Sequence, residues 1–199
     1  GDRVPGGGRE AAPPAPARPL LNQAAANPFV PVPELWKMLK VTSYGTQAKA
    51  QEALVKLHLA VIEKFRKGRS SVQLMDLTDA GWQLAGLPPP TRRGRGGMLH
   101  RHIAHWIVEV GKRRGYKSLV EWEVTGSNGS NHRVDAAWRL NNGRWACFEV
   151  VVDCLDNLES HLTTTFGAGA DVESVTVVDV GIAEREARRQ QLGAIASIA

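Results

Sequence analysis

The feature that most constrains this chain is the stretch HRVDAAWRLNNGRWACFEVVVD, residues 132–153. It predicts a hairpin of two strands joined at Asn141-Asn142-Gly143, because Asn and Gly accept positive φ at low cost. The second strand, 145–152, is almost wholly apolar, which is typical of a central strand buried on both faces. Period-two alternation predicts two faces for the first strand: Val134, Ala136 and Trp138 on one, and Asp135, Ala137 and Arg139 on the other.

Each predicted strand carries one carboxylate, Asp135 on the first and Glu149 on the second. A carboxylate within a buried strand is costly unless it is paired or holds a metal. Glu149 is therefore a candidate site residue, and Asp135 is its candidate partner. Two hard oxygen ligands of this kind can hold Mg²⁺ or Mn²⁺.

The flanking sequence predicts an αβββαβ order with a mixed four-stranded sheet, and hence an α+β or α/β domain over 98–199. Residues 98–114 carry an apolar stripe at helical spacing, and Gly115 follows as a C-terminal stop. The predicted stripe consists of Leu99, Ile103, Trp106, Ile107 and Val110. The remaining predicted elements are strands at 118–124 and 174–180 and helices at 155–166 and 183–191.

This arrangement resembles the PD-(D/E)XK nuclease superfamily, the restriction-endonuclease-like fold. Asp135 takes the place of the family Asp, and Glu149 takes the Asp/Glu of the (D/E)XK element. The resemblance implies that both residues are catalytic and bind Mg²⁺ or Mn²⁺ in a DNA endonuclease. The family Lys would fall at residue 151, which is Val151. Candidate substitutes for its charge are Lys117, Arg133 and Arg144.

A narrower resemblance covers residues 95–182. The steps Gly96-Gly97-Met98-Leu99-His100-Arg101 and Gly115-Tyr116-Lys117 resemble nuclease-like domains appended to ATPases of conjugative and other mobile elements. This implies a mobile-element, transfer or defence setting, with an ATPase or transfer machinery as partner. Because the lysine is missing, an alternative is a DNA-binding or assembly module that keeps the fold without the chemistry. A transcriptional regulator is a further alternative.

The first helix of this domain holds one more candidate. Superfamily members often place a polar residue here that faces the metal, and His105 is nearest to that position. His102, His105 and Glu109 share a helix face at spacings of three and four. The alternative is that they are polar residues edging the apolar stripe. A zinc site from His100, His102 and His105 does not match the i, i+4 spacing of helical zinc ligands.

Residues 30–88 predict a separate module. Its order is two helices (33–39 and 46–59), two strands (60–65 and 72–77) joined by a basic loop, and a helix capped by Thr78. This order resembles MarR-type winged helix-turn-helix domains, which implies DNA contact, although a protein-only role and RNA binding remain alternatives. The candidate contacts are Thr46, Gln47 and Lys49 in the major groove and Arg66, Lys67 and Arg69 on phosphates.

The charge distribution supports a polyanion partner. Residues 30–97 hold eleven Lys and Arg against five Asp and Glu, whereas residues 98–199 hold eleven against thirteen. The excess positive charge therefore lies on the first module and on the linker 89–97, whose candidate DNA-binding residues are Arg92, Arg93 and Arg95. An isoelectric point near 9.5 with this asymmetry favours DNA.

Several bulk features set the remaining expectations. Residues 1–29 are rich in Pro, Ala and Gly and predict a disordered tail. No apolar run reaches the roughly 18 residues of a membrane span, and no signal peptide is visible, so a cytoplasmic location with free Cys147 and Cys154 is expected. The sequence begins with Gly, as in a trimmed, tagged or excised chain. Cutting both DNA strands would need two sites, so a homodimer is a further expectation.

Overall fold

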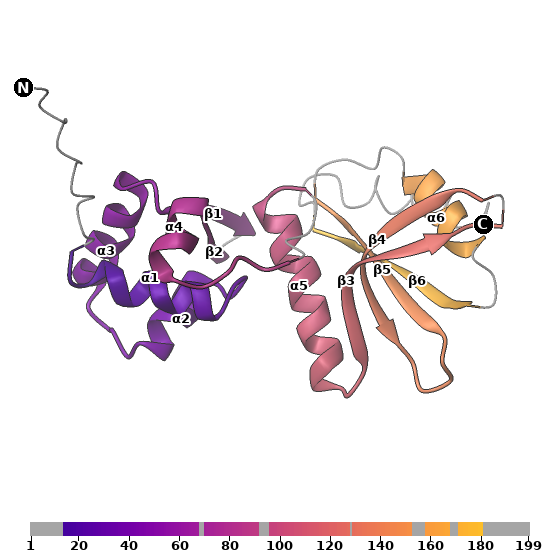
Figure 1. Ribbon diagram of the computed structural model, residues 1–199. Helices are drawn as coiled ribbons and strands as arrows, with labels where there is room; N and C mark the ends of the chain where they lie inside the picture. The colour runs from indigo at the N-terminus through magenta and orange to yellow at the C-terminus, as the bar shows by residue number, and fades with distance from the viewer. Residues whose placement is uncertain are drawn as a thin grey trace, which may run out of the picture. The chain divides into compact units, whose positions relative to one another are not determined.

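The computed structural model describes residues 14–67, 70–91, 96–127, 129–152, 158–167 and 171–180. Within these ranges the protein is a mixed α and β structure with six helices, a two-stranded sheet and a mixed four-stranded sheet (Figure 1). The chain divides into two compact units, Gly1–Ile62 with Met75–Pro89 and Glu63–Leu74 with Pro90–Ala199. Among the described helices, none combines the length and apolar character needed to cross a membrane.

The first part of the chain contains the elements predicted for residues 30–88, preceded by one more helix. Thr78 caps the last helix of this part as predicted, since its side-chain oxygen accepts a hydrogen bond from the Gly81 amide at 3.1 Å. Ser43 caps the third helix, which starts at Tyr44 rather than at Thr46. The elements are α1 Ala17–Ala26, α2 Val32–Met38, α3 Tyr44–Lys56, β1 Ala60–Lys67, β2 Ser70–Leu77 and α4 Asp79–Ala85.

Helix α1 corrects the expectation of a disordered tail over residues 1–29, which is wrong for Ala17–Ala26. Leu20 and Leu21 are fully buried and pack in one core with Leu35, Trp36 and Leu54. Alanine has the highest helix propensity, so an alanine-rich segment needs few large apolar residues to form a helix that docks on a core. The prediction was based on the average composition of the whole segment, which does not reveal this local pair of leucines.

The second part is a four-stranded sheet with one helix on each face (Figure 1). Its elements are α5 Met98–Arg113, β3 Lys117–Thr125, β4 Asn131–Arg139, β5 Trp145–Val151, α6 Leu158–Phe166 and β6 Val172–Asp179. The strand order is β3-β4-β5-β6, antiparallel except for the parallel pair β5–β6. The predicted hairpin and its central second strand are confirmed, and Gly143 in the turn has φ 81°. The predicted helix 183–191 lies outside the described residues.

The predicted apolar stripe of α5 is confirmed at Ile107 and is wrong at Trp106. Ala104, Ile107 and Val108 are buried against the sheet, whereas Trp106 is 64% exposed and does not belong to the core. At Gly111 the helix lies so close to β4 that a Cβ would be 2.5 Å from Nε1 of Trp138. The contact face is therefore centred on Ala104 and Gly111, and Trp106 points away from it.

Strands β3 and β4 exchange faces at one rung, contrary to the simple alternation predicted for β4. Ala136 packs with the α5 cluster, but Val134 packs with Ala137 and Cys147 in the cluster on the other face. The ladder between β3 and β4 omits the rung of Glu121 and Asp135, and Glu121 has φ 51°. An irregularity of this kind re-aims the side chains beyond it. His132, two residues before Val134, thus lies on the same face as α6, where its ring stacks on that of His161.

Candidate metal centre

The carboxylates lie where β4 and β5 separate. The β4–β5 ladder runs from the pair Arg139–Trp145 to the pair Ala136–Phe148 and ends there, one residue short of Asp135 and Glu149. A pocket of about 260 Å³ opens at this point. It is lined by Gly96, His100, His132, Arg133, Asp135, Glu149, Val150, Val151, Leu158 and His161.

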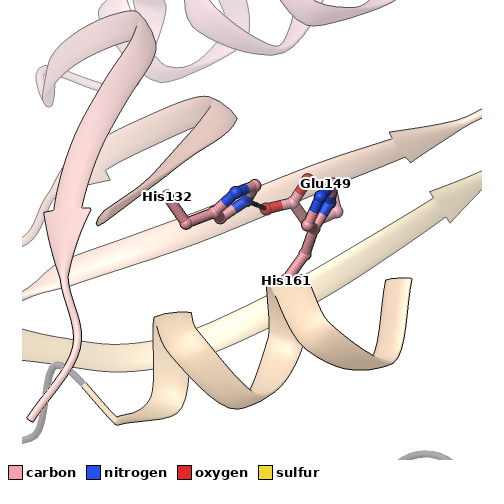
Figure 2. Close-up of side chains that lie close together, drawn as sticks. All are labelled: His132, Glu149 and His161. Atoms are coloured by element: carbon pink, nitrogen blue, oxygen red, sulfur yellow. Dashed lines mark hydrogen bonds and ion pairs between the residues drawn. The ribbon is translucent and has the colours of Figure 1, made fainter. Parts of the chain in front are cut away.

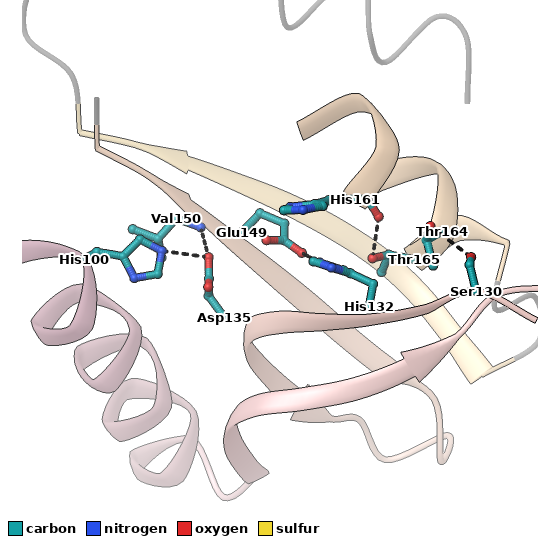
Figure 3. Close-up of polar contacts among 9 residues, drawn as sticks. All are labelled: His100, Ser130, His132, Asp135, Glu149, Val150, His161, Thr164 and Thr165. Carbon is teal, nitrogen blue, oxygen red and sulfur yellow. Dashed lines mark hydrogen bonds and ion pairs between the residues drawn. The ribbon is translucent and has the colours of Figure 1, made fainter. Parts of the chain in front are cut away.

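Asp135 is held between β5 and α5. Its Oδ2 accepts a hydrogen bond from the Val150 amide at 2.8 Å and lies 3.1 Å from Nε2 of His100 (Figure 3). The carboxylate therefore takes the role of a strand partner for the Val150 amide where the ladder ends. His100 lies in the first turn of α5, so this contact ties the helix start to the sheet.

Glu149 is the most buried charged residue of the site, only 4% exposed. Its Oε1 lies 2.7 Å from Nε2 of His132 on the neighbouring strand (Figure 2). Burial raises the pKa of the Glu149 carboxyl, the hydrogen bond to His132 lowers it, and the negative charge of Asp135 raises it again. The net direction is upward, so this carboxyl holds a proton more tightly than an exposed one.

His161 adds a second imidazole from α6. Its ring stacks on that of His132 with centroids 4.0 Å apart and an interplanar angle of 25°. Burial lowers the pKa of His161, and the adjacent His132 lowers it further, while Asp135 acts in the opposite direction. One ligand atom each from His132, Glu149 and His161 lie within 4.8 Å of one another. The neutral imidazole favoured here is the form that binds metals.

The structure brings the two predicted carboxylates into one pocket and places His105 elsewhere. Among the described residues the pocket is lined by His100 and not by His105. Five residues make about 1.4 turns of an α-helix, so the two side chains point in directions about 140° apart. His102 is buried in α5. Val151 forms part of the pocket wall and packs against Leu158 on α6.

The candidate substitutes for the lysine differ in position. Arg133 lines the pocket, but its guanidinium lies 2.6 Å from a carboxylate oxygen of Glu123 and 3.6 Å from one of Glu121. Arg144 bonds the Val172 carbonyl and pairs with Glu173. Lys117 is exposed at the start of β3. Of the three, Arg133 alone lines the pocket, and its charge is shared with two glutamates.

His132 and His161 are the site residues that the sequence did not reveal. Neither belongs to a spaced ligand motif, since they lie 29 positions apart in the sequence and on two different elements, β4 and α6. His132 reaches Glu149 because the strands exchange faces at Glu121, which has a positive φ. Glutamate rarely adopts positive φ, so the sequence does not predict this irregularity. The available signal was weak: a histidine three residues before Asp135 and another on the helix after Glu149.

The candidate DNA-binding residues that the structure describes belong to α3 and β1. Thr46 and Lys49 are exposed near the start of α3, and Arg66 is exposed near the end of β1, which Lys67 completes. Gln47 is half-buried and donates to the Val41 carbonyl at 2.7 Å, so its side chain braces the preceding loop. The other four, Arg69, Arg92, Arg93 and Arg95, lie outside the described residues.

The donor set fits a divalent cation. Carboxylate oxygens and imidazole nitrogens from two strands and a helix converge on one pocket. No protein-family model matches this chain, and no curated protein is significantly similar to it. The chemistry of the pocket therefore carries the functional argument.

Proposed function

We propose that the protein is a DNA-binding protein whose second part is a metal-dependent DNA endonuclease, with Asp135 and Glu149 in its active site. One observation carries the proposal: two partly or fully buried carboxylates, from adjacent strands, meet in a pocket at the point where the strands separate. A buried pair of like charges is unfavourable in the folded protein, and such arrangements concentrate at functional sites.

The pocket suits phosphodiester chemistry. When bound, a divalent cation would neutralise charge on a phosphodiester and activate a water molecule. The protein's own groups keep the cation site in place: the Val150 amide and His100 fix Asp135, and His132 fixes Glu149. A volume of about 260 Å³ is enough for an ion, water and one phosphodiester group but too small to enclose a nucleotide pair, so the remainder of a DNA substrate would lie outside the pocket.

Support for DNA as the partner comes from the first part of the chain. Its helix–helix–hairpin–helix order accompanies the net positive charge of residues 30–97. Thr46, Lys49 and Arg66 are exposed and available for contact. Binding through such residues would rest mainly on phosphates and would vary little with sequence. An ATPase or transfer machinery and a second copy of the chain stay predictions as further partners.

A second candidate function is DNA binding or assembly without cleavage. Val151 favours it, because an apolar side chain packed on α6 stands where the resembled family has its lysine. The pairing of Arg133 with Glu121 and Glu123 favours it as well. Under this alternative the pocket would be structural and the basic module would be the working part.

A cleavage assay separates the two. Supercoiled, linear and branched DNA would be incubated at low salt with Mg²⁺, Mn²⁺, Co²⁺ or Zn²⁺ and the native chain, Asp135→Asn or Glu149→Gln. The matched control is Glu159→Gln, an exposed glutamate on α6. We expect metal-dependent nicking by the native chain and the control, and a loss of at least about a hundredfold in both pocket variants.

Gel-shift measurements on the same proteins complete the test. DNA binding without cleavage under every metal, unchanged in both pocket variants, would overturn the endonuclease and favour the second candidate. Failure of the native chain to bind DNA at low salt would overturn both.

A further inference from the structure

We propose that His132, Glu149 and His161 form a site for a transition-metal dication of the Zn²⁺, Co²⁺ or Fe²⁺ class, and that Asp135 positions the site without ligating the ion. The inference deepens the proposed function, on which it rests, by naming the ligands and the class of metal. It also changes the expectation of Mg²⁺, which considered oxygen ligands only.

The three ligands come from three elements that the fold holds together. His132 lies near the start of β4, Glu149 lies within the central strand β5, and His161 lies on the second turn of α6. Figure 2 shows both imidazoles beside the Glu149 carboxylate, that of His132 coming from β4 and that of His161 coming from the helix α6. The packing of α6 on β5 and β6 through Leu158 and Leu162 fixes the distance between helix and sheet.

The spacing of the ligand atoms is close to that of a metal site. Ligands bound to Zn²⁺ at 2.0–2.1 Å in tetrahedral geometry lie about 3.3 Å from one another. His132 and Glu149 are already 2.7 Å apart, and all three ligand atoms lie within 4.8 Å. Contraction of the longest separation by about 1.5 Å is within the range of a side-chain rotation, since His161 is half-buried rather than locked in the core.

The donor types select the metal. Mg²⁺ prefers an octahedron of oxygen ligands and keeps several waters, whereas imidazole nitrogen suits Zn²⁺ and other late transition metals. Two imidazoles and one carboxylate leave a further coordination position, as catalytic transition-metal sites do. That position would face the pocket that Asp135 and Arg133 also line.

The contacts of Asp135 assign it a different role. Its Oδ2 accepts a hydrogen bond from the Val150 amide and lies within hydrogen-bond distance of His100, and Asp135 is not part of the cluster of three ligand atoms within 4.8 Å of one another. Withdrawing that oxygen to a metal would leave the amide of Val150, next to Glu149, without its strand-like partner. Asp135 therefore orients the β5 backbone beside the ligand Glu149.

The test is cobalt titration of the metal-free full chain, read by visible d–d absorption without any DNA. We expect one Co²⁺ per chain with the intense bands of four- or five-coordination, displacement by Zn²⁺, and no displacement by about a hundredfold excess of Mg²⁺. His132→Ala, His161→Ala and Glu149→Gln are expected to weaken Co²⁺ binding by more than about a hundredfold. Asp135→Asn is expected to weaken it by less than about tenfold.

The matched control is His58→Asn. His58 lies just after α3 with φ 54°, a conformation that Asn accepts, so this variant removes an imidazole remote in sequence from the site. Circular dichroism establishes that each variant is folded. Competition between Zn²⁺ and Mg²⁺ on the unmodified chain tests the proposal even where a variant does not fold.

Four results would overturn the proposal: no Co²⁺ binding, displacement by Mg²⁺, retention of binding in His132→Ala and His161→Ala, or loss of binding in Asp135→Asn with the fold intact. A near-ultraviolet thiolate band that is lost in Cys154→Ser would also do so, by assigning a cysteine ligand. Metal binding as proposed without DNA cleavage would leave this site standing and reject the endonuclease. DNA cleavage supported by Mg²⁺ alone would support the endonuclease and reject this transition-metal site.

Discussion

At the scale of single residues, the buried charge of Glu149 lowers the stability of the metal-free protein. Its buried carboxyl is stabilised by one imidazole and destabilised by burial and by Asp135. Glu149→Gln keeps the volume and the hydrogen bond to His132 while removing the charge. We expect it to raise the free energy of unfolding at pH 8 by about 1 kcal/mol, measured by urea denaturation.

The stabilisation expected from Glu149→Gln increases with pH. A carboxyl whose pKa is raised in the folded state binds protons more tightly there, so its contribution is present below the unfolded value of 4.5 and is lost as the pH rises through the folded pKa. The advantage of Glu149→Gln should therefore be near zero at pH 4 and should grow as the pH rises. Glu159→Gln is the control. An advantage that is largest at acid pH would contradict the assignment.

Cys147 should be chemically inert in the folded protein. It is fully buried in β5, and burial together with the negative charge of Glu149 raises the pKa of its thiol to about 12. At pH 8 only about one thiol in 10⁴ is the reactive thiolate. In a Cys154→Ser background, we expect a disulfide reagent to label Cys147 only after unfolding in urea. Rapid labelling under native conditions would show that the strand opens locally.

The site residues that could be predicted from the sequence are those whose charge is unusual for a buried strand. Asp135 and Glu149 stand out because a charge in an apolar strand needs a reason. His132 and His161 do not, because each is an ordinary histidine until the fold brings them within reach of one carboxylate. His105 was predicted by family position on a helix, and His100 is the helix residue that reaches Asp135.

At the scale of elements, the contact between α5 and β4 depends on Gly111. A Cβ there would lie 2.3 Å from Oγ of Ser118 and 2.5 Å from Nε1 of Trp138, whose indole donates to the Ile107 carbonyl. We expect Gly111→Ala to lower the free energy of unfolding by about 2 kcal/mol, despite the higher helix propensity of alanine. Scanning calorimetry measures it.

Gly45→Ala is the matched control for that substitution. Gly45 lies in α3, and a Cβ at this position meets no atom within 4 Å. The same change should therefore stabilise its helix by about 0.5–1 kcal/mol, through propensity and lower entropy of the unfolded chain. Equal effects at the two glycines would mean that the close packing of α5 on Trp138 contributes nothing.

Elements were more predictable than their faces. The hairpin of β4 and β5, helix α5 and strand β6 follow from turn chemistry and periodicity, and the structure confirms them. Trp106 was assigned to the core because large apolar residues at helical spacing usually lie there. The face of α5 that packs on the sheet is formed instead by Ala104, Ile107, Val108 and Gly111. Periodicity alone does not report how closely two elements approach.

At the scale of the whole molecule, binding to DNA and binding of metal should be separable by mutation. The triple variant Arg66→Ala, Lys67→Ala, Arg69→Ala removes three positive charges within the basic segment 66–69 of the sequence. We expect weaker binding of duplex DNA, with the slope of log K against log salt reduced in magnitude by about 2.7, or 0.9 per lost phosphate contact. Cobalt binding should be unchanged. An unaltered salt slope would exclude these residues as phosphate contacts.

For the whole chain, composition correctly indicated the distribution of charge but gave a wrong prediction for the N-terminal segment. The charge asymmetry between residues 30–97 and 98–199 is legible without any structure. The alanine- and proline-rich opening was read as uniform, yet its described portion holds α1 with two fully buried leucines. Averages over thirty residues conceal a ten-residue helix whose stability comes from docking rather than from its own sequence.

The exchange of faces at Glu121 and Asp135 limits how this sequence can vary in length over evolution. Inserting or deleting one residue between His132 and Asp135 would turn His132 to the opposite face of the sheet, because the side-chain period of a strand is two. A length change in the turn between β3 and β4 leaves both strands as they are. Descendants that keep the site are therefore expected to tolerate insertions in that turn and to preserve the three-residue step from His132 to Asp135.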